Sequence, residues 1–529
     1  MRLPQPSLVV HEKWAKLPFM SLSANAAVLV GAALWLFGCS TDNGGSSSAA
    51  GAGGEVSSVG EGGTTSSGGG ANAGSGGAMG GSAGQAGTSP PAAGGNPPSG
   101  GGAPSGEGGA TGGMDNTGGT TVTDTASTDT ETSTNTNTDS STSPGGDSGT
   151  STDAPGDAEW LPSWATSIQK TEPNNLPSMP FAGNTVRQFV WPTYSGSEIR
   201  LQLSNEKGSG PLEIAKVHIA KAGASSGQID AGTDTAFTFE GNLGVTIAPG
   251  QTVWSDAVTF PLEKMQLTAL TMQLGGSVPP EITGHPGART YSYLTAGDAV
   301  AQADLSSGER IERWYFINAI EVMAPKDAYA VSILGDSITD GYGVMEEFKR
   351  WPDYLTVEID NDPQLKDKVS VLNAGMGGNT LLYPNQDFMD SGVDRVARDI
   401  LTRPKVKWVV VLMGVNDIIY TDATADAIIA GYETVIEQCK NAGIRVYGAT
   451  ITPFVGDADD VARRETVNAW IKDSQQFDAV IDLAAAVADP GNPQQLLPAY
   501  DNDGLHPSTA GYEAMGKAVD LSLFQSSAD

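Results

Sequence analysis

The sequence is poor in the residues that carry metal, redox and nucleic-acid chemistry. Its 529 residues include two cysteines, Cys39 and Cys439, and four histidines, and these form neither paired CxxC motifs nor a His/Cys cluster. We therefore expect no metal site and no cofactor. Lysine and arginine number 29 against 61 acidic residues, which gives a net charge of -32. Because phosphate contacts need clustered cations, nucleic acid is not an expected partner.

Large apolar side chains are nearly absent between residues 40 and 156. Gly, Ser and Ala dominate this stretch first, and Thr, Asp and Asn follow. A segment of this composition buries too little apolar surface to offset the entropy of ordering its backbone. We therefore predict a long disordered linker over 40–156 that tethers the folded part of the chain.

Residues 1–39 are typical of an export signal. Arg2, Lys13 and Lys16 precede a mostly apolar run over 21–38, the pattern of a signal peptide. The run ends in LFGC, which resembles a bacterial lipobox and implies lipidation of Cys39, an N-terminal membrane anchor and no disulfide partner for Cys439. An uncleaved membrane anchor is the alternative, since about 18 apolar residues can span a bilayer. Ser40 provides no inner-membrane retention signal of the Asp type, so the outer membrane or the cell surface is the expected location.

Aromatic residues become frequent from about residue 157, where a folded region begins. Between residues 185 and 324, runs of β-branched and aromatic residues are separated by Gly, Ser, Asn and Pro turns. About eight short strands at this spacing predict a β-sandwich or jelly-roll-like domain over 157–325. This domain either binds carbohydrate through exposed aromatics such as Trp191 or supports the domain that follows. We favour support, because aromatics in short strands belong more often to a core.

Residues 326–529 alternate between strand and helix patterns. Continuous apolar runs such as VVVLM at 409–413 are typical of parallel strands covered on both faces. The expected strands are 329–334, 369–373, 408–413, 445–449 and 479–483, and the expected helices are 351–361, 393–402, 425–441, 460–474 and 509–524. This alternation predicts an α/β domain with a doubly wound, flavodoxin-like, parallel five-stranded sheet and helices on both faces. Ligands of such sheets bind beyond the carboxyl ends of the strands.

A single serine follows the first of these strands. Residues 331–343 read VSILGDSITDGYG, the pattern of a buried strand that ends in a tight turn with Ser337 at its tip. A serine is a weak nucleophile until a base takes its proton. His506 is the only histidine downstream of it, and Asp503 lies three residues before His506. These three residues therefore supply a candidate nucleophile, base and orienting carboxylate.

Four sequence blocks resemble those of the SGNH (GDSL-type) hydrolases. They are GDSIT at 335–339, NAGMGGNT at 373–380, GVND at 414–417 and DGLHP at 503–507. All four occur in the order of that family, and the resemblance spans residues 332 to about 524. The serine turn differs from the nucleophile elbow of the α/β-hydrolases, which has glycine where Thr339 stands. The run at 185–205 is similar to the opening of the β-rich domain that several secreted members carry.

The resemblance implies a serine esterase that forms an acyl-enzyme on Ser337. It assigns the oxyanion hole to the backbone N–H groups of Ser337 and Gly378 and to the side-chain amide of Asn416. Gly375 and Gly377 are alternatives to Gly378. We expect a second group, Arg350, Trp351 and Asn379, to line the substrate cleft.

The expected class of substrate follows from the resemblance together with one feature of the sequence. Members with an upstream β-rich domain are often linked to carbohydrate esters, and the chain has no large apolar lid segment. We therefore expect short acyl groups, acetyl first, on a polysaccharide. An aryl- or lipid-esterase of the same superfamily is the alternative within the enzyme class. A non-catalytic polysaccharide-binding surface lipoprotein is the alternative from another class.

Overall fold

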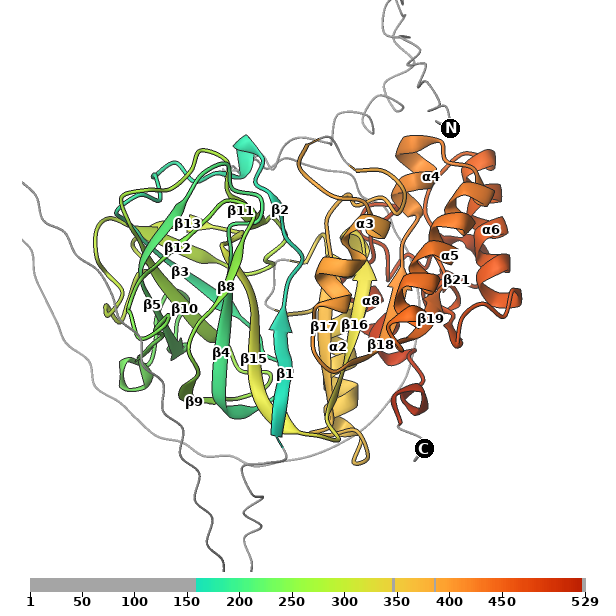
Figure 1. Cartoon of the computed structure of the whole chain (residues 1–529). Helices are drawn as coiled ribbons and strands as arrows, with labels where there is room; N and C mark the ends of the chain where they lie inside the picture. The colour runs from blue at the N-terminus through green and yellow to red at the C-terminus, as the bar shows by residue number, and fades with distance from the viewer. Residues whose placement is uncertain (1–157, 345–347, 385–386, 526–529) are drawn as a thin grey trace, which may run out of the picture. The chain divides into compact units, whose positions relative to one another are not determined.

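The computed structural model describes residues 158–344, 348–384 and 387–525. The predicted export signal, with Cys39, and the whole of the predicted linker lie outside the described residues. Figure 1 shows a β-rich part, from Ala158 to Pro325, beside an α/β part that follows it in the chain. Within the described ranges, no helix combines the length and the apolarity that crossing a membrane requires.

Two antiparallel sheets make up most of the β-rich part. In the first, β15 (Ile317–Pro325) lies between β1 (Ala158–Ala165) and β4 (Gly196–Ser204), and β4 also pairs with β8 (Thr252–Trp254) and β9 (Val258–Leu262). The second has the order β13 (Glu309–Ile311), β12 (Ser292–Thr295), β3 (Thr185–Val190), β10 (Thr268–Leu274), β5 (Leu212–Lys221) and β6 (Thr235–Ala236), with β7 (Val245–Ile247) on β5. A small sheet joins β14 (Trp314–Tyr315), β11 (Thr283–His285) and β2 (Gln169–Lys170).

Alternation of side chains along the strands explains how the two sheets pack. In β4, Ile199, Leu201 and Leu203 are fully buried, whereas Arg200 and Gln202 between them are partly exposed. The inward residues of β4 and β15 share one apolar cluster with those of β5 and β10, which belong to the other sheet. The chain thus forms the β-rich region that the sequence predicts. Strands β1 and β2 lie before residue 185, where the prediction placed no strand.

The α/β part is built on a parallel sheet of five strands. Its order is β17 (Val369–Gly375), β16 (Tyr329–Gly335), β18 (Val406–Leu412), β19 (Arg445–Ala449) and β20 (Ala479–Ile481), and all four pairings are parallel. The residues of β18 from Trp408 to Leu412 are buried, as expected of a strand covered on both faces. A short hairpin of β21 (Ala488–Asp489) and β22 (Asn492–Leu496) precedes the last helix.

Helices connect these strands and pack in two groups. α2 (Trp351–Asn361) lies against α8 (Thr509–Lys517), and α5 (Ala425–Asn441) lies against both α3 (Gly392–Val396) and α6 (Ala458–Asp473). Three shorter helices are α1 (Ser337–Asp340), α4 (Val415–Thr421) and α7 (Leu483–Val487). The helix predicted to reach residue 524 ends earlier, because Asp520 caps a separate 3-10 turn, Leu521–Phe524, that buries Phe524.

The β-rich and α/β parts share buried surface. Strand β1 packs against β17 at the edge of the parallel sheet, and Figure 1 shows β1 on the side of the β-rich part that faces the α/β part. Ala330 of β16 and Leu372 of β17 belong to the apolar cluster of the β-rich part. Hydrogen bonds join the same edge, since Ser370 Oγ donates to the carbonyl of Pro162 at 2.5 Å.

Candidate active site

The residues singled out from the sequence gather at the carboxyl end of the parallel sheet. Ser337 follows β16, Gly378 follows β17 and Asn416 follows β18. Asp503 and His506 lie in the loop that leads to α8. Parallel strands bring such loops to one edge, which is why residues more than 150 positions apart in the chain come together.

Ser337, His506 and Asp503 form one hydrogen-bonded chain. The distance from Ser337 Oγ to His506 Nε2 is 2.8 Å, and His506 Nδ1 lies 2.9 Å from Asp503 Oδ2. Asp503 also accepts the backbone N–H of His506 at 2.8 Å and that of Leu505 at 3.1 Å. Burial raises the pKa of Asp503, but the hydrogen bonds and charge of His506 outweigh it, so the pKa lies below its usual value. The carboxylate therefore stays ionised beside the imidazole.

A single turn of helix, α1, carries Ser337. The side chain of Asp336 caps it by accepting the N–H of Ile338 at 2.9 Å, and Gly341, with φ of 78°, ends it. The loss of water on burial raises the pKa of Asp336 to about 7. Neighbouring strands approach α1 so closely that a Cβ on Gly375 would lie 2.4 Å from the backbone nitrogen of Asp340. Glycine is therefore required at that position.

The three predicted oxyanion donors lie on α1, on the loop after β17 and on α4. The N–H of Ser337 is the first of α1 and so has no partner within the helix. Gly378 adopts the left-handed conformation, with φ of 72°, which favours glycine. The side-chain amide of Asn416 donates one N–H to the carbonyl of Asn379 at 2.9 Å. An amide nitrogen carries two N–H groups, so the second is a further potential donor. Of the alternatives to Gly378, Gly375 already donates its N–H to Asn373 Oδ1 at 2.8 Å.

Buried charges hold the loops that carry these donors. Asp417 accepts the N–H groups of Leu381 and Leu382 at 2.7 and 3.0 Å, which ties the loop after β17 to the start of α4. Arg395 of α3 is fully buried and donates to the carbonyls of Gly335 and Ala374 at 2.7 and 2.8 Å. Sequence reasoning missed Arg395, whose only signal is the acidic residue Asp399 one helical turn later.

Arg350, Trp351 and Asn379, the predicted substrate contacts, are all buried and hydrogen-bonded to neighbouring residues, and Arg350 also lines a pocket together with residues of the β-rich part. Trp351 is fully buried and its indole N–H donates to Thr339 Oγ1 at 3.2 Å. Asn379 is also fully buried, and its amide is used at both ends, by the carbonyl of Asp390 and by the Arg395 side chain. The guanidinium of Arg350 forms two hydrogen bonds with Asp353, at 2.8 and 3.0 Å. All three therefore support the loops of the site from within.

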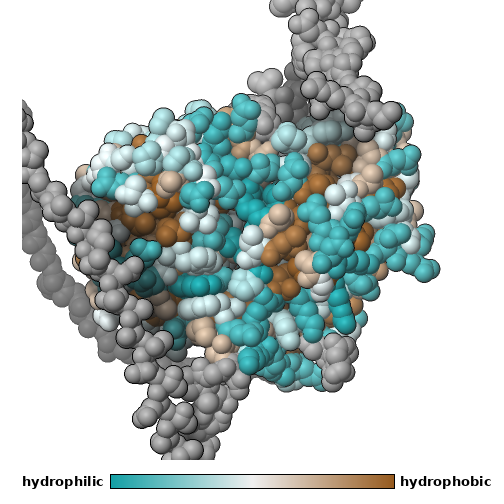
Figure 2. Space-filling model, in the orientation of Figure 1, coloured by the Kyte–Doolittle hydropathy of each residue, from teal (hydrophilic) through white to brown (hydrophobic). Residues whose placement is uncertain are grey.

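Apolar and aromatic side chains that the sequence reasoning missed lie on the segments that follow β16, β17, β18 and β19. The ring of Tyr342 lies 4.3 Å from that of His506, centroid to centroid. Tyr383, Tyr420 and Val455 are 49%, 53% and 67% exposed. Val455 is next to the histidine loop, because its N–H donates to Gly504 at 2.7 Å. Figure 2 shows apolar residues on the visible face in patches between hydrophilic ones. The signal in the sequence is a large apolar residue in a loop that follows a strand.

The arrangement suits nucleophilic attack by a serine hydroxyl with a histidine as proton acceptor. Across the described ranges, no three His, Cys, Asp or Glu side chains gather in a way that could hold a metal ion. A family model described as the GDSL-like lipase/acylhydrolase family matches residues 333–514. The α/β part belongs to the GDSL-type hydrolases.

The match to this family includes Ser337, Asn416, Asp503 and His506, and the chain is accordingly a carboxylic ester hydrolase. Solved structures that resemble it include a carbohydrate acetylesterase family member from Sinorhizobium meliloti, with 19% identity and a TM-score of 0.30 over 36% of this chain and 94% of that one. An aryl esterase from M. smegmatis is similar with 17% identity and a TM-score of 0.30, over 36% of this chain and 96% of that one. The comparison with curated proteins gives no match.

Proposed function

We propose that this GDSL-type hydrolase cleaves esters through an acyl-enzyme on Ser337. The observation that carries the proposal is the unbroken chain of hydrogen bonds from Ser337 Oγ through His506 to Asp503, at 2.8 and 2.9 Å. His506 Nε2 takes the hydroxyl proton while Ser337 Oγ attacks the ester carbonyl, and the same proton then passes to the departing alcohol. His506 next removes a proton from water, whose oxygen attacks the acyl carbonyl. The bond between the acyl carbon and Ser337 Oγ then breaks, the acid leaves, and His506 returns the proton to Ser337 Oγ. Asp503 fixes the imidazole and stabilises its charged form.

The negative charge that develops on the carbonyl oxygen needs donors already in place. We assign this role to the N–H groups of Ser337 and Gly378 and to the second amide N–H of Asn416. Arg395 and Asp417 support the assignment, because they fix the three loops on which the donors lie. Each donor is worth roughly 3–4 kcal/mol of barrier when it is lost.

The favoured substrate is a short acyl ester, acetyl first, on a carbohydrate. Ser337 and Asn416 are only 5% and 2% exposed, so little room is open beside the oxyanion donors and a small acyl group fits best. Tyr383, on the loop after β17, and Tyr420, in α4, are half exposed, and such rings offer flat faces to a sugar. Aryl esters are a second candidate, favoured by the Tyr342 ring beside His506.

Hydrolysis of p-nitrophenyl esters from acetate to decanoate by the purified full chain tests this proposal. We expect activity that falls with acyl length and disappears in Ser337→Ala. The matched control is Ser332→Ala, which removes a buried hydroxyl without a partner from the strand that leads to the site. Activity that survives Ser337→Ala would mean another nucleophile. A folded chain without activity on any ester would favour a polysaccharide-binding lipoprotein instead.

Acetylated xylan and phenyl acetate distinguish the two substrate candidates. Release of acetate from the polysaccharide at a higher kcat/KM than from the aryl ester supports the carbohydrate proposal. The reverse order supports the aryl-esterase alternative.

We also propose that the chain is exported and anchored through a lipid on Cys39. The support is the apolar run over 21–38 that ends at this cysteine. Partition of the bacterial product into a detergent phase should be lost in Cys39→Ser. A Cys39→Ser product that still enters the detergent phase would instead favour the uncleaved anchor.

A further inference from the structure

The last residue of the nucleophile helix is bound by the β-rich part of the chain. Asp340, three residues after Ser337, is 1% exposed. Its Oδ1 lies 3.0 Å from His285 Nε2, and its Oδ2 accepts a hydrogen bond from Arg289 at 2.8 Å. Arg289 Nε also donates to the backbone carbonyl of Asp340 at 3.0 Å. One loop of the β-rich part thus holds both the side chain and the main chain of this residue.

His285 is shared between two acceptors. Its Nδ1 lies 2.9 Å from the carbonyl of Ser167, and its Nε2 faces the Asp340 carboxylate. A carbonyl and a carboxylate both only accept, so both ring nitrogens of His285 face acceptors from outside its own strand. The ring also stacks on Trp314, with centroids 5.6 Å apart.

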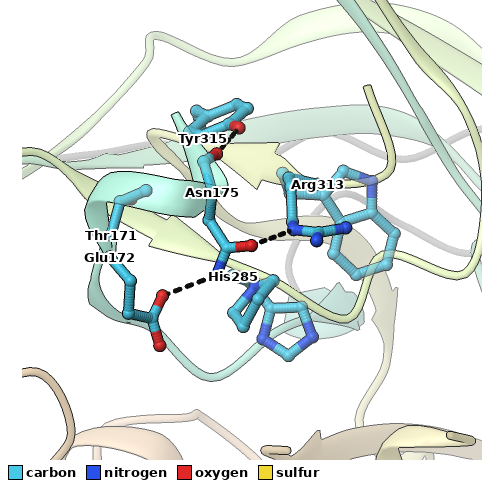
Figure 3. A pocket seen from close by; sticks show the side chains of 8 residues that line it. Thr171, Glu172, Asn175, His285, Arg313 and Tyr315 are labelled. Carbon is cyan, nitrogen blue, oxygen red and sulfur yellow. Dashed lines mark hydrogen bonds between the residues drawn. The ribbon is translucent and has the colours of Figure 1, made fainter. Parts of the chain in front are cut away.

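Asp340, not the other nearby acid, is the carboxylate that is hydrogen-bonded to His285. The ring borders a pocket that also contains Glu172 (Figure 3). There the Glu172 carboxylate accepts hydrogen bonds from Gln169 and Asn175, at 2.6 and 2.8 Å. Among the described residues, the carboxylate hydrogen-bonded to His285 is therefore that of Asp340.

The loop is shaped around this carboxylate. Residues 284–289 read GHPGAR, and a Cβ on Gly287 would lie 1.8 Å from Asp340 Oδ2. Any larger residue at this position would push the carboxylate away from His285 and Arg289. Arg289 itself adopts a positive φ of 55°, a conformation that costs free energy outside glycine and persists where the surroundings impose it.

Support of this kind matters because α1 has only four residues. One turn of helix has no stability of its own in water, so contacts from outside must fix the direction of the Ser337 hydroxyl. The guanidinium of Arg289 also lies 5.7 Å from the ring of Tyr342, which in turn contacts the ring of His506. Arg289 is therefore linked to the supports of both the nucleophile and the base.

We propose that His285 and Arg289 are positioning residues for Ser337 that act through Asp340, so that the β-rich part completes the geometry of the catalytic turn. This inference rests on the proposed role of Ser337 as nucleophile. It gives the β-rich part a specific task in the reaction instead of a general supporting one.

The test compares Arg289→Ala and Asp340→Asn in the full chain with Lys264→Ala. Lys264 also joins the two parts, through Asp360 and Asp367, but at the edge of the sheet where the strands begin. The reactivity of Ser337 is measured directly as the rate of its phosphorylation by diethyl p-nitrophenyl phosphate. In that reaction the Ser337 Oγ–P bond forms, the P–O bond to p-nitrophenolate breaks and His506 takes the hydroxyl proton.

We expect the phosphorylation rate and kcat for p-nitrophenyl acetate to fall together, roughly tenfold or more, in Arg289→Ala and in Asp340→Asn. KM should change little. Arg289→Lys should recover part of the loss, because a lysine replaces one of the two hydrogen bonds. Lys264→Ala should stay within about twofold of the unchanged chain.

Three outcomes overturn the proposal, and they are distinguishable. An unchanged phosphorylation rate in Arg289→Ala refutes the positioning role of His285 and Arg289 but leaves the proposed function intact. An equal loss in Lys264→Ala shows that any bond between the two parts has the same effect. If the chain without substitutions neither hydrolyses esters nor accepts the diethylphosphoryl group on Ser337, the positioning role and the proposed function are refuted together. If Asp340→Asn does not fold, Arg289→Ala still decides, because the Arg289 side chain lies partly at the surface.

Discussion

Replacing Arg395 with methionine removes the buried cation that holds the loops of the site while keeping most of the side-chain volume. Four acceptors lose a donor, in addition to the Asp399 carboxylate. They are the carbonyls of Gly335 and Ala374, Asn379 Oδ1 and Ser167 Oγ, all bonded at 2.7 to 2.9 Å. At roughly 1 kcal/mol for each buried acceptor left without its donor, we expect the free energy of unfolding to fall by about 4 kcal/mol or more. The Asp399 carboxylate keeps its hydrogen bond from Arg398 Nε, at 2.7 Å, and so still has a cationic partner in the variant.

Arg398→Met is the matched control. It removes the other cation of Asp399 and its bond to Glu206, but Arg398 touches none of the carbonyls next to the site. Urea unfolding gives the stability of each variant, and p-nitrophenyl acetate hydrolysis without denaturant gives kcat for the folded protein. We expect both variants to be destabilised and only Arg395→Met to lose kcat, by roughly tenfold or more. Equal kcat in the two folded variants, or an Arg395→Met chain as stable as the parent, would refute this reasoning.

Three further predictions concern the site. Asn416→Ala should lower kcat by roughly 10²–10³-fold with little change in KM, as measured with p-nitrophenyl acetate, and a change confined to KM would contradict its assignment to the oxyanion hole. Because the pKa of Asp503 is lowered in the folded chain, its contribution to stability is present above the unfolded pKa and is lost as the pH falls through the folded pKa. The difference in Tm between the parent chain and Asp503→Asn should therefore shrink below about pH 4. A difference in Tm that stays constant would refute this prediction. The raised pKa of Asp336, about 7, has the opposite effect, because between pH 4 and 7 the folded state holds a proton that the unfolded state has lost. As the pH rises from 4 to 7, Asp336→Asn, which keeps a good helix cap, should therefore lose less stability than the parent chain. Parallel curves of stability against pH for the two chains would contradict the shift.

Much of the fold and the main chemistry of the site follow from local patterns in the sequence. The apolar runs at 329–334 and 408–413 predict buried parallel strands, and the structure has strands Tyr329–Gly335 and Val406–Leu412 there. Once the strands are placed, the topology alone brings Ser337 and His506 to one edge. The hydrogen bond between them is therefore expected from the order of the motifs.

The errors arise where neighbours distant in sequence decide the outcome. Trp351 begins a predicted helix and Asn379 stands in the block at 373–380, but their contacts with Thr339 and Arg395 lie in the interior. Arg395 and His285 carry no motif, and their roles depend on acceptors from separate strands and loops. A charged residue on a short helix and a histidine in a glycine-rich loop look like surface features until the packing is known. Single residues that connect two parts of a chain are thus the hardest to infer from one sequence.

The apolar cluster that contains both Ile320 of β15 and Leu372 of β17 has a consequence for engineering. A catalytic unit cut out at residue 326 would expose the face of β17 that β1 covers, and would tend to aggregate. Grafting this unit onto another carrier would require redesign of that face first. Because this cluster is shared, the two parts should also melt in one cooperative transition.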